Sequence, residues 1–248
     1  MTKEYSGLAR IYDYLVAGVD FEGWIDYIEA LLGRFGLEAA SVCDIACGTG
    51  NTAFPFARRG YKTTGVDISG EMLALARLKA KAQNLDVAFI EQDMRALALP
   101  AQADLITCFH DGLNYLPDIK EISQTFKGVY DNLRPGGAFI FDLNRVTWLS
   151  GSDTGPMVLE EEDLTLIWQS GYERESEIWT IKLTAFVRDG DVYHKFTETH
   201  REKAYHQTEI ALKLSAAGFH ILGSFNAFSH NPADDGSVRH FYVAQKPR

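Results

Sequence analysis

A glycine-rich turn and an acidic residue that follows it are the side chains best suited to hold a nucleotide. Residues 41–47 form a short apolar segment, and Gly48 and Gly50 interrupt it just before a helix expected to begin near Asn51. Glycine permits a tight turn and a close approach of a ligand to the backbone, while the first turn of a helix presents free N–H groups. Asp67 ends the next apolar segment, at the strand edge where doubly wound sheets bind the ribose of an adenosine ligand. The pattern therefore predicts an adenosine-binding site.

Two classes of adenosine ligand fit this turn, and Asp44 favours one of them. Gly48, Gly50 and Ala53 match the dinucleotide fingerprint in its G-x-G-x-x-A form, which alone would suit an NAD-dependent oxidoreductase. A carboxylate at Asp44 would repel a pyrophosphate, but it would attract the ammonium and sulfonium of S-adenosylmethionine. We therefore expect S-adenosylmethionine as the cofactor. The alternative is that Asp44 only caps the turn and that Asp67 is a solvated acid at a strand end.

The composition is that of an ordinary globular protein and excludes several classes of partner. The 248 residues are 46% hydrophobic and 23% charged, enough for one large α/β domain with an additional element. A formal net charge of −10 argues against binding to nucleic acid and favours a small-molecule substrate. The three cysteines, two of them beside the turn, indicate neither a disulfide framework nor a metal site. Without a signal peptide or an apolar segment of roughly 20 residues, we expect a cytoplasmic protein with no membrane partner.

Strand and helix patterns alternate along the first part of the chain, as in a doubly wound parallel sheet. Expected strands cover 41–46, 62–67, 86–91, 103–108 and 137–142, and expected helices cover 69–77 and 118–133, with a stop at 134–137. The alternation of strand and helix patterns stops at 151–205, where about three antiparallel strands are expected, with a hairpin turn at 188–191. A helix over 206–217 and strands over 219–228 and 238–245 then resume the α/β pattern. We expect a core of 1–150 and 206–248 with an inserted layer of 151–205.

Five segments, in order, resemble the motifs of the class I S-adenosylmethionine-dependent methyltransferases. They are residues 42–50, 65–73, 91–95, 104–110 and 133–139. Within that class, residues 8–14, residues 110–116 and the inserted layer resemble a subgroup that methylates small molecules, including amino sugars. The chain has Phe-His-Asp-Gly at 109–112 in place of the Asn/Asp-Pro-Pro-aromatic motif of many DNA and protein amine methylators. Methylation of amides or nucleobase amino groups is therefore disfavoured.

The resemblance implies a seven-stranded Rossmann-like sheet ordered 3-2-1-4-5-7-6, an N-terminal helical cap and an insertion that closes over the cofactor. It also implies that Asp93 and Met94 bind adenine and that one of Tyr12 and Tyr14 closes over the methionine carboxylate. Asp67 is expected to accept the ribose hydroxyls. The expected cofactor-binding residues are Tyr12, Tyr14, Asp44, Ala46, Gly48, Gly50, Asp67, Ile68, Met72, Asp93, Met94, Phe109 and His110.

His110 is the candidate catalytic residue, because it follows the fourth expected strand where the transferred methyl group should lie. It would act as a base toward a nitrogen or oxygen acceptor; otherwise it only packs at the strand end. Asp111, Asn114 and Tyr115 continue the same loop and are candidates for the acceptor pocket. The expected function is methyl transfer by in-line displacement to a small molecule. A non-catalytic protein that binds S-adenosylmethionine or S-adenosylhomocysteine remains an alternative, as does the oxidoreductase.

The inserted layer is expected to be either a lid over the acceptor or the interface of a possible homodimer. Its aromatic residues at 168, 172, 179 and 193 would wall an apolar pocket or pack on a partner subunit. His194, Glu198 and His200 share one strand face, which would suit a metal ion, but we expect a solvated face instead. Trp24, Tyr27 and Ile28 are expected to be core residues of a helix that precedes the first strand.

Overall fold

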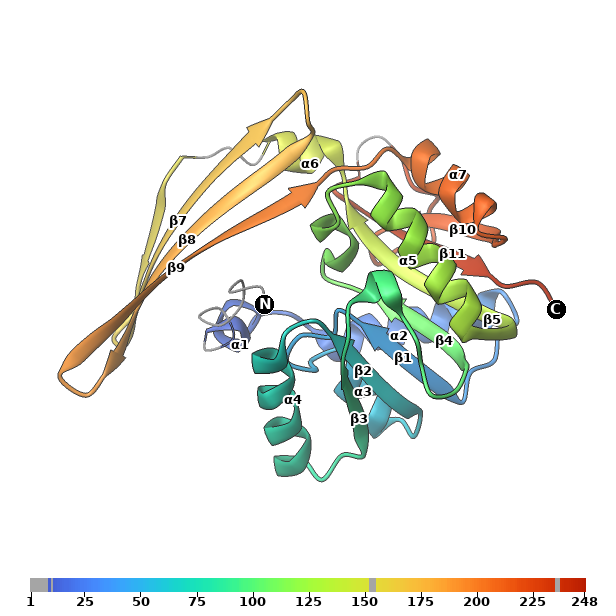
Figure 1. The fold of residues 1–248 in the computed structure, drawn as a ribbon, viewed down its shortest axis with the longest axis horizontal. Helices are drawn as coiled ribbons and strands as arrows, with labels where there is room; N and C mark the ends of the chain where they lie inside the picture. The colour runs from blue at the N-terminus through green and yellow to red at the C-terminus, as the bar shows by residue number, and fades with distance from the viewer. Residues whose placement is uncertain (1–8, 10, 152–154, 235–236) are drawn as a thin grey trace.

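The central element of the fold is a mixed seven-stranded sheet (Figure 1). The structure is a computed structural model that describes residue 9 and residues 11–151, 155–234 and 237–248. The strand order is β10-β11-β5-β4-β1-β2-β3, with β11 antiparallel to both neighbours and the other pairs parallel. The strands are β1 (Ser41–Ile45), β2 (Lys62–Asp67), β3 (Val87–Glu91), β4 (Ala103–Cys108), β5 (Leu133–Asn144), β10 (His220–Asn226) and β11 (Arg239–Gln245). This is the predicted order 3-2-1-4-5-7-6, which is confirmed.

Helices cover the two faces of this sheet. They are α1 (Tyr12–Leu15), α2 (Phe21–Arg34), α3 (Ala53–Arg58), α4 (Gly70–Ala82), α5 (Ile119–Asn132), α6 (Val146–Gly151) and α7 (Gln207–Ala216), with short 3₁₀ turns η2 (Met94–Ala96) and η3 (Gly112–Tyr115). Residues 8 and 10, which belong to the predicted N-terminal motif, and residues 152–154, at the start of the predicted insertion, lie outside the described residues.

Two apolar cores hold the helices on the sheet. On one face, Phe126 of α5 packs with Cys43 and Phe139 of the strands. On the other face, Ile28 of α2 packs with Val42. Because neighbouring residues of a strand point to opposite faces, Val42 and Cys43 fall in different cores. The prediction that Trp24, Tyr27 and Ile28 belong to the core is confirmed, since all three are buried.

Capping side chains begin the helices where the sequence predicts them. Ser69 Oγ accepts a hydrogen bond from the backbone N–H of Met72 at 3.2 Å, and α4 begins at the next residue, Gly70. Asp118 and Glu121 form a capping box at the start of α5. Each cap satisfies N–H groups that have no partner within the helix. The amino ends of α4 and α5 are therefore set by local sequence.

The start of β5 differs from the prediction. The strand begins at Leu133, directly after α5, whereas the sequence indicates a stop at 134–137 and a strand from 137. The pairing of β5 with β4 shifts register between Ala103 and Leu105, so a short irregularity absorbs the Pro-Gly-Gly segment within the strand. Gly136 makes this possible, because its φ of +84° lies in the left-handed region.

The inserted residues form a second, antiparallel sheet of four strands, which projects from the core as a long arm (Figure 1). The strands are β6 (Met157–Glu160), β7 (Leu164–Glu173), β8 (Ile178–Asp189) and β9 (Val192–Lys203). The predicted number of about three is wrong, because backbone hydrogen bonds between Glu161 and Leu164 close a turn that separates β6 from β7. Along β8, Trp179, Ile181, Leu183 and Ala185 share one face and are all buried, while Val187 on the same face is half-buried.

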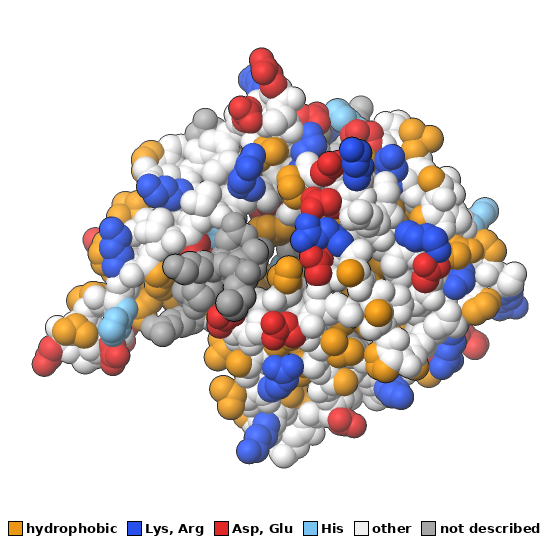
Figure 2. Space-filling view, in the orientation of Figure 1, with side chains coloured by type: hydrophobic (Ala, Val, Ile, Leu, Met, Phe, Trp, Pro, Cys, Tyr) orange, Lys and Arg blue, Asp and Glu red, His pale blue; other side chains and the backbone are white. Residues whose placement is uncertain are grey.

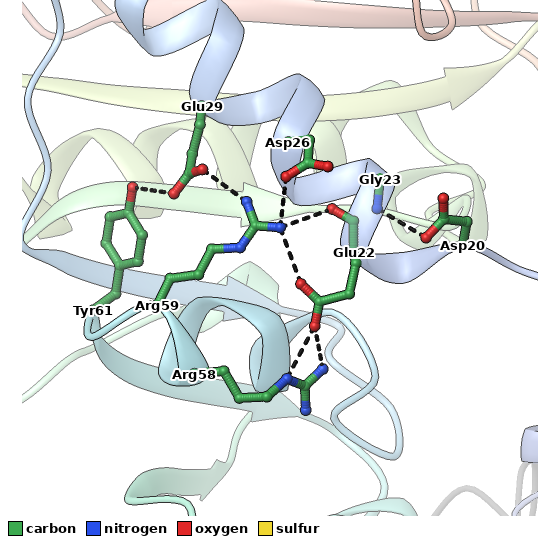
Figure 3. Close-up of polar contacts among 8 residues, drawn as sticks. All are labelled: Asp20, Glu22, Gly23, Asp26, Glu29, Arg58, Arg59 and Tyr61. Atoms are coloured by element: carbon green, nitrogen blue, oxygen red, sulfur yellow. Dashed lines mark hydrogen bonds and ion pairs between the residues drawn. The ribbon is translucent and has the colours of Figure 1, made fainter.

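An ion-pair network connects α2 with the end of α3 and with Arg59, the residue directly after α3 (Figure 3). The Arg59 guanidinium lies within 3.0 Å of carboxylate oxygens of three acids on α2, and Arg58 pairs with the first of these acids. The participants on α2 are Glu22, Asp26 and Glu29. Exposed ion pairs of this kind each contribute little to the stability of the fold. Burial of the apolar side chains of α2 therefore supplies most of the free energy that holds this helix on the sheet. The network sets the orientation of α2, which carries Trp24.

Charges of both signs are mixed over the visible surface. Figure 2 shows Lys and Arg interspersed with Asp and Glu over this face, without a continuous basic area. That distribution agrees with the net charge of −10. Within the described ranges, no helix combines the length and the apolar composition needed to cross a membrane.

Candidate active site

A cavity of about 420 Å³ lies at the carboxyl ends of the central parallel strands, where the insertion meets the core. Its volume falls in the range of small-molecule sites. The loops after β1, β2, β3 and β4 form one side, and β9 of the insertion forms the other. The lining residues are Tyr12, Ala46, Gly48, Asp67, Ile68, Met72, Gln92, Asp93, Met94, Arg95, His110, Gly112, Tyr115, Leu116, Pro117, Glu121, Thr199, His200 and Arg201.

The glycine turn forms the floor of this cavity. Ala46, Gly48 and Gly50 all have left-handed φ values, of 56°, 54° and 85°. A Cβ atom at Gly50 would lie 2.7 Å from the ring of Phe54, so only glycine fits there. Gly48 lines the cavity, and the ring of Tyr12 lies over the space that a side chain at this position would occupy. Gly50 itself does not line the cavity, and its left-handed conformation is part of the turn on the side away from the cavity.

Asp67 is oriented toward the turn by backbone hydrogen bonds. Its carboxylate accepts from Gly48 N and from Ser69 N, both at 2.8 Å. Burial raises the pKa of this carboxyl, while the backbone hydrogen bonds oppose the shift. A carboxylate accepts about four hydrogen bonds, so two backbone donors leave capacity for hydroxyl groups of a ligand. Asp67 therefore faces the cavity with its geometry already set.

Asp93 and Arg95 close the end of the cavity beside β3. Asp93 caps η2 by accepting from Arg95 N at 2.9 Å, and it pairs with the Arg95 guanidinium. Arg95 also forms an ion pair with Glu121 of α5. Hydrogen bonds from Arg95 outweigh burial and lower the pKa of Asp93. Met94 lines the same end, so the pair predicted to hold adenine lies together on the wall.

The two N-terminal tyrosines lie in different environments. Tyr12 lines the cavity, and its ring lies 3.7 Å from the position that a Cβ at Gly48 would take. Burial, with smaller effects of Asp111 and Asp67, raises its pKa, so it remains a neutral phenol. Tyr14 is 43% exposed and lies outside the cavity wall.

Asp44 is buried behind the turn and does not line the cavity. The Thr107 hydroxyl donates to it at 2.8 Å, and the Thr52 hydroxyl donates to its other oxygen. Burial raises the pKa of Asp44 to about 6, against the effect of these two hydrogen bonds. The structure thus places this carboxylate in a supporting position, where only its charge reaches a ligand.

His110 is held in an unusual conformation at the end of β4. Its φ is 54° and that of Asp111 is 66°, and two consecutive left-handed residues other than glycine indicate local backbone strain. The imidazole stacks on Trp24 with ring centroids 4.2 Å apart. Burial lowers the pKa of His110 to about 4, so the ring is neutral at physiological pH. Among the described residues, its Nε2 has no hydrogen-bond partner.

A buried polar cluster lies behind His110. Arg239 of β11 forms ion pairs with Asp111, at 2.6 Å, and with Asp142 of β5. Glu202 of β9 lies nearby, and burial together with the charge of Asp111 raises its pKa to about 8. Asn144 donates to Glu202 at 3.3 Å. The cluster ties the loop after β4 to the last strand and to the insertion.

Asn114, another predicted acceptor residue, joins the insertion to the core. Its side-chain amide donates to the Lys203 carbonyl at 2.9 Å and accepts from Asn144 N at 3.0 Å. It is fully buried and lies outside the cavity wall, as do Asp111 and Phe109, whereas Tyr115 lines the cavity. Phe109 packs in the α2 core.

The expectation of a solvated face on β9 is wrong for two of its three residues. His194 is exposed, but Glu198 and His200 are buried and lie 3.3 Å apart as a pair. His200 lines the cavity together with Thr199 and Arg201. Across the part of the chain that the structure describes, no three His, Cys, Asp or Glu residues are arranged to hold a metal ion.

Comparisons with known proteins identify the class to which this fold and cavity belong. A family model described as a methyltransferase domain matches residues 42–137. A crystal structure of an S-adenosylmethionine-dependent methyltransferase from Clostridium acetobutylicum is 31% identical, with a TM-score of 0.88 over 98% of this chain and 99% of that chain. The chain therefore belongs to the S-adenosylmethionine-dependent methyltransferases, and S-adenosylmethionine is its cofactor.

Two curated relatives extend the comparison. A protein of Geobacillus sp. (strain WCH70), provisionally named a methyltransferase, is 31% identical over 98% of this chain and 99% of its own. A dTDP-3-amino-3,4,6-trideoxy-alpha-D-glucopyranose N,N-dimethyltransferase of Streptomyces venezuelae is 25% identical over 86% of this chain and 90% of its own. The likeness thus spans the core and the insertion alike.

Proposed function

We propose that this enzyme transfers a methyl group to a nitrogen of a small-molecule amine, with a hydroxyl oxygen as the second candidate. S-Adenosylmethionine supplies an electrophilic methyl group whose bond to sulfur breaks as the acceptor's lone pair forms the new bond in line. The residues present fit this cofactor: Gly48 adds no side chain to the cavity wall, the Asp67 carboxylate suits ribose hydroxyls, and Asp93 with Met94 forms an end wall for adenine.

One observation carries the choice of nitrogen: the loop after β4 places in the cavity wall a neutral histidine that is a weak base. Because the pKa of His110 is lowered to about 4, its ring accepts a hydrogen bond more readily than it removes a proton. A hydroxyl acceptor must lose its proton as the methyl group arrives. A neutral amine attacks with its own lone pair, and the proton of the product ammonium leaves afterwards to water.

His110 is therefore proposed to orient the acceptor. Nε2 is buried and unpartnered; once a neighbouring side chain moves to open it to the cavity, in the tautomer with hydrogen on Nδ1 it accepts an N–H from the amine and turns the amine's lone pair toward the methyl group. The stack on Trp24 holds the imidazole plane in place. The amino-sugar relative from Streptomyces venezuelae acts on an amine, which supports the same choice.

The insertion is proposed to be the acceptor lid. Three consecutive residues of β9, Thr199, His200 and Arg201, line the cavity opposite the donor loops, which supports this role. The exposed strand β6 at the sheet edge offers apolar side chains to a second copy, so a homodimer stays a prediction to be tested by sedimentation. Residues 1–150 and 206–248 are proposed to act as the donor-binding core.

The test is a transfer assay with methyl-labelled S-adenosylmethionine and small-molecule extract, followed by identification of the methylated atom by NMR. We expect an N-methylated product, and we expect a hydroxyl analogue of that acceptor to be methylated poorly. An O-methylated product would refute the choice of nitrogen while leaving the enzyme class intact. Donor binding without transfer to any extract component would favour the non-catalytic alternative.

A further inference from the structure

The ammonium group of Lys79 occupies a site of four polar contacts that the reaction described above does not use. It projects from α4 and lies 2.8 Å from each Asp13 oxygen, 2.6 Å from Asn51 Oδ1 and 3.1 Å from Thr49 Oγ1. It also lies 5.5 Å from the ring centroid of Phe54. An ammonium has three hydrogens to donate, so this environment fully satisfies it.

Asp13 is held by the same group of residues. Besides Lys79, its Oδ1 accepts from the Thr49 hydroxyl at 2.6 Å and from Asn51 Nδ2 at 3.0 Å. Burial acts against ionisation, but the hydrogen bonds from Lys79, Thr49 and Asn51 prevail and lower the pKa of Asp13. Since Thr49 and Asn51 belong to the glycine turn, Asp13 fastens the N-terminal segment directly to the turn.

The residue before Asp13 forms the donor end of the cavity. Tyr12 covers Gly48, as the 3.7 Å approach of its ring shows. Yet α1 spans only four residues, and Ile11 at its amino end provides no capping side chain. A helix this short has no stability of its own, so contacts outside it must keep Tyr12 in place.

Apolar contacts hold the same segment from two sides. Ile11, with Tyr12 and Leu15 beside it, packs against Met72 of α4 and against the inner face of the insertion. The insertion residues in this cluster are Leu164, Leu166, Leu183 and Ala185. Figure 1 shows α1 between the arm and α4. The segment thus separates the insertion from the core, and Asp13 is its polar anchor.

We propose that Lys79 is a positioning residue for the donor site: through Asp13 it locks residues 11–15 over the glycine turn, and this lock must open for the donor to exchange. The order of events follows from the geometry, because Tyr12 covers the backbone that a ligand must approach. The inference concerns the donor alone and is independent of which acceptor atom is methylated.

The experiment compares Lys79→Met, Asp13→Asn and the double variant with Lys81→Met as a control. Methionine retains the apolar stem over Phe54, and Lys81 is an exposed residue on the same helix. Hydrogen exchange followed by mass spectrometry reports on residues 11–15. Stopped-flow tryptophan fluorescence gives the dissociation rate of S-adenosylhomocysteine.

We expect both single variants to speed exchange of the segment and to raise the dissociation rate about tenfold, with no change for Lys81→Met. The double variant should match the faster single variant within about twofold, because both changes break one contact. Additive effects, unchanged exchange, or faster exchange with an unaltered dissociation rate would each overturn the proposal. If the unmodified protein failed to bind S-adenosylhomocysteine, the enzyme class would be in error, and the exchange data would still decide whether Lys79 holds the segment.

Discussion

Replacing Asp67 separates two ways in which a carboxylate can hold the donor. Its oxygens accept from Gly48 N and Ser69 N at 2.8 Å, and it lines the cavity. If it also accepts ribose hydroxyls, Asp67→Ala removes charge-assisted hydrogen bonds worth about 1.5–3 kcal/mol, which is roughly 10- to 150-fold in affinity. The ribose is common to S-adenosylmethionine and S-adenosylhomocysteine, so both affinities should fall, and that of S-adenosylmethionine should fall further because its sulfonium also loses an attractive charge. A purely electrostatic role would weaken only the cationic donor.

The pKa of Asp67 gives the same prediction a second measurement. Burial raises this pKa in the free protein, and hydrogen bonds from a ligand to the carboxylate would lower it again. Donor binding should therefore release protons at a pH near the raised pKa, and Asp67→Asn should abolish that release. Between the ordinary and the raised pKa, the folded state binds more protons than the unfolded state, so this carboxyl favours folding more as the pH falls through that range.

Isothermal titration of both ligands, in buffers of different ionisation enthalpy, measures affinity and proton release together. Asp86→Ala is the matched control, because Asp86 is an exposed acid at the opposite end of the sheet, before β3. Unchanged affinity for both ligands in a folded Asp67→Ala protein would refute the reasoning, since the ribose would then be held elsewhere.

Three further predictions concern the buried rings of His110 and Phe126. His110→Ala should slow methyl transfer about 10- to 100-fold, because the acceptor loses its orienting contact, while the affinity for S-adenosylhomocysteine measured by titration stays the same. Because the pKa of His110 is about 4 when folded and 6.5 ordinarily, stability should fall as the pH drops from 6.5 toward 4, by at most about 3 kcal/mol, and chemical denaturation of His110→Ala should show a flatter dependence. Phe126→Ala should destabilise the fold by about 3–5 kcal/mol, since this ring is fully buried against Phe139 and Phe141; a loss below 1 kcal/mol in the same assay would contradict the assignment of the core.

The parallel core was predictable because its signals are local. Ser69 and Asp118 start helices by their own side chains, and the strand β1 is a short apolar run ended by a glycine turn. Where a boundary depended on pairing, the prediction failed. The segment after α5 reads as a stop, but Leu133 before it pairs with β4, and Gly136 and Gly137 exchange backbone hydrogen bonds with Lys246 directly after β11. These contacts include the segment in β5, with Gly136 absorbing the irregularity. The turn at Glu161 was similarly missed, although four successive acids at 160–163 mark the interruption.

The acceptor side of the cavity was less predictable, because its residues are distant in sequence. Arg239 reaches Asp111 only because β11 pairs with β5, and Glu202 arrives on the insertion. The residues next to Arg239 and Glu202 in the sequence form no motif that would predict their contacts with the loop after β4. Asp44 is different, because strand alternation already indicates its position: it shares a face of β1 with Val42, which packs under α2, and so it points away from the cavity.

The position of Asp44 still bears on how the enzyme distinguishes donor from product. With a pKa of about 6 it is mostly ionised at neutral pH, and its charge and that of Asp67 each contribute to the raised pKa of Tyr12 and of the buried Cys47 thiol. Those groups stay neutral, so the two carboxylates contribute a negative potential on the cavity side of the turn. The sulfonium of S-adenosylmethionine is attracted by this field, and the neutral sulfur of S-adenosylhomocysteine is not. Because Asp44 is buried, salt screens the attraction only weakly. If the sulfonium lies in this field, methyl transfer removes the charge that the carboxylates attract, and we expect S-adenosylhomocysteine to leave faster than S-adenosylmethionine.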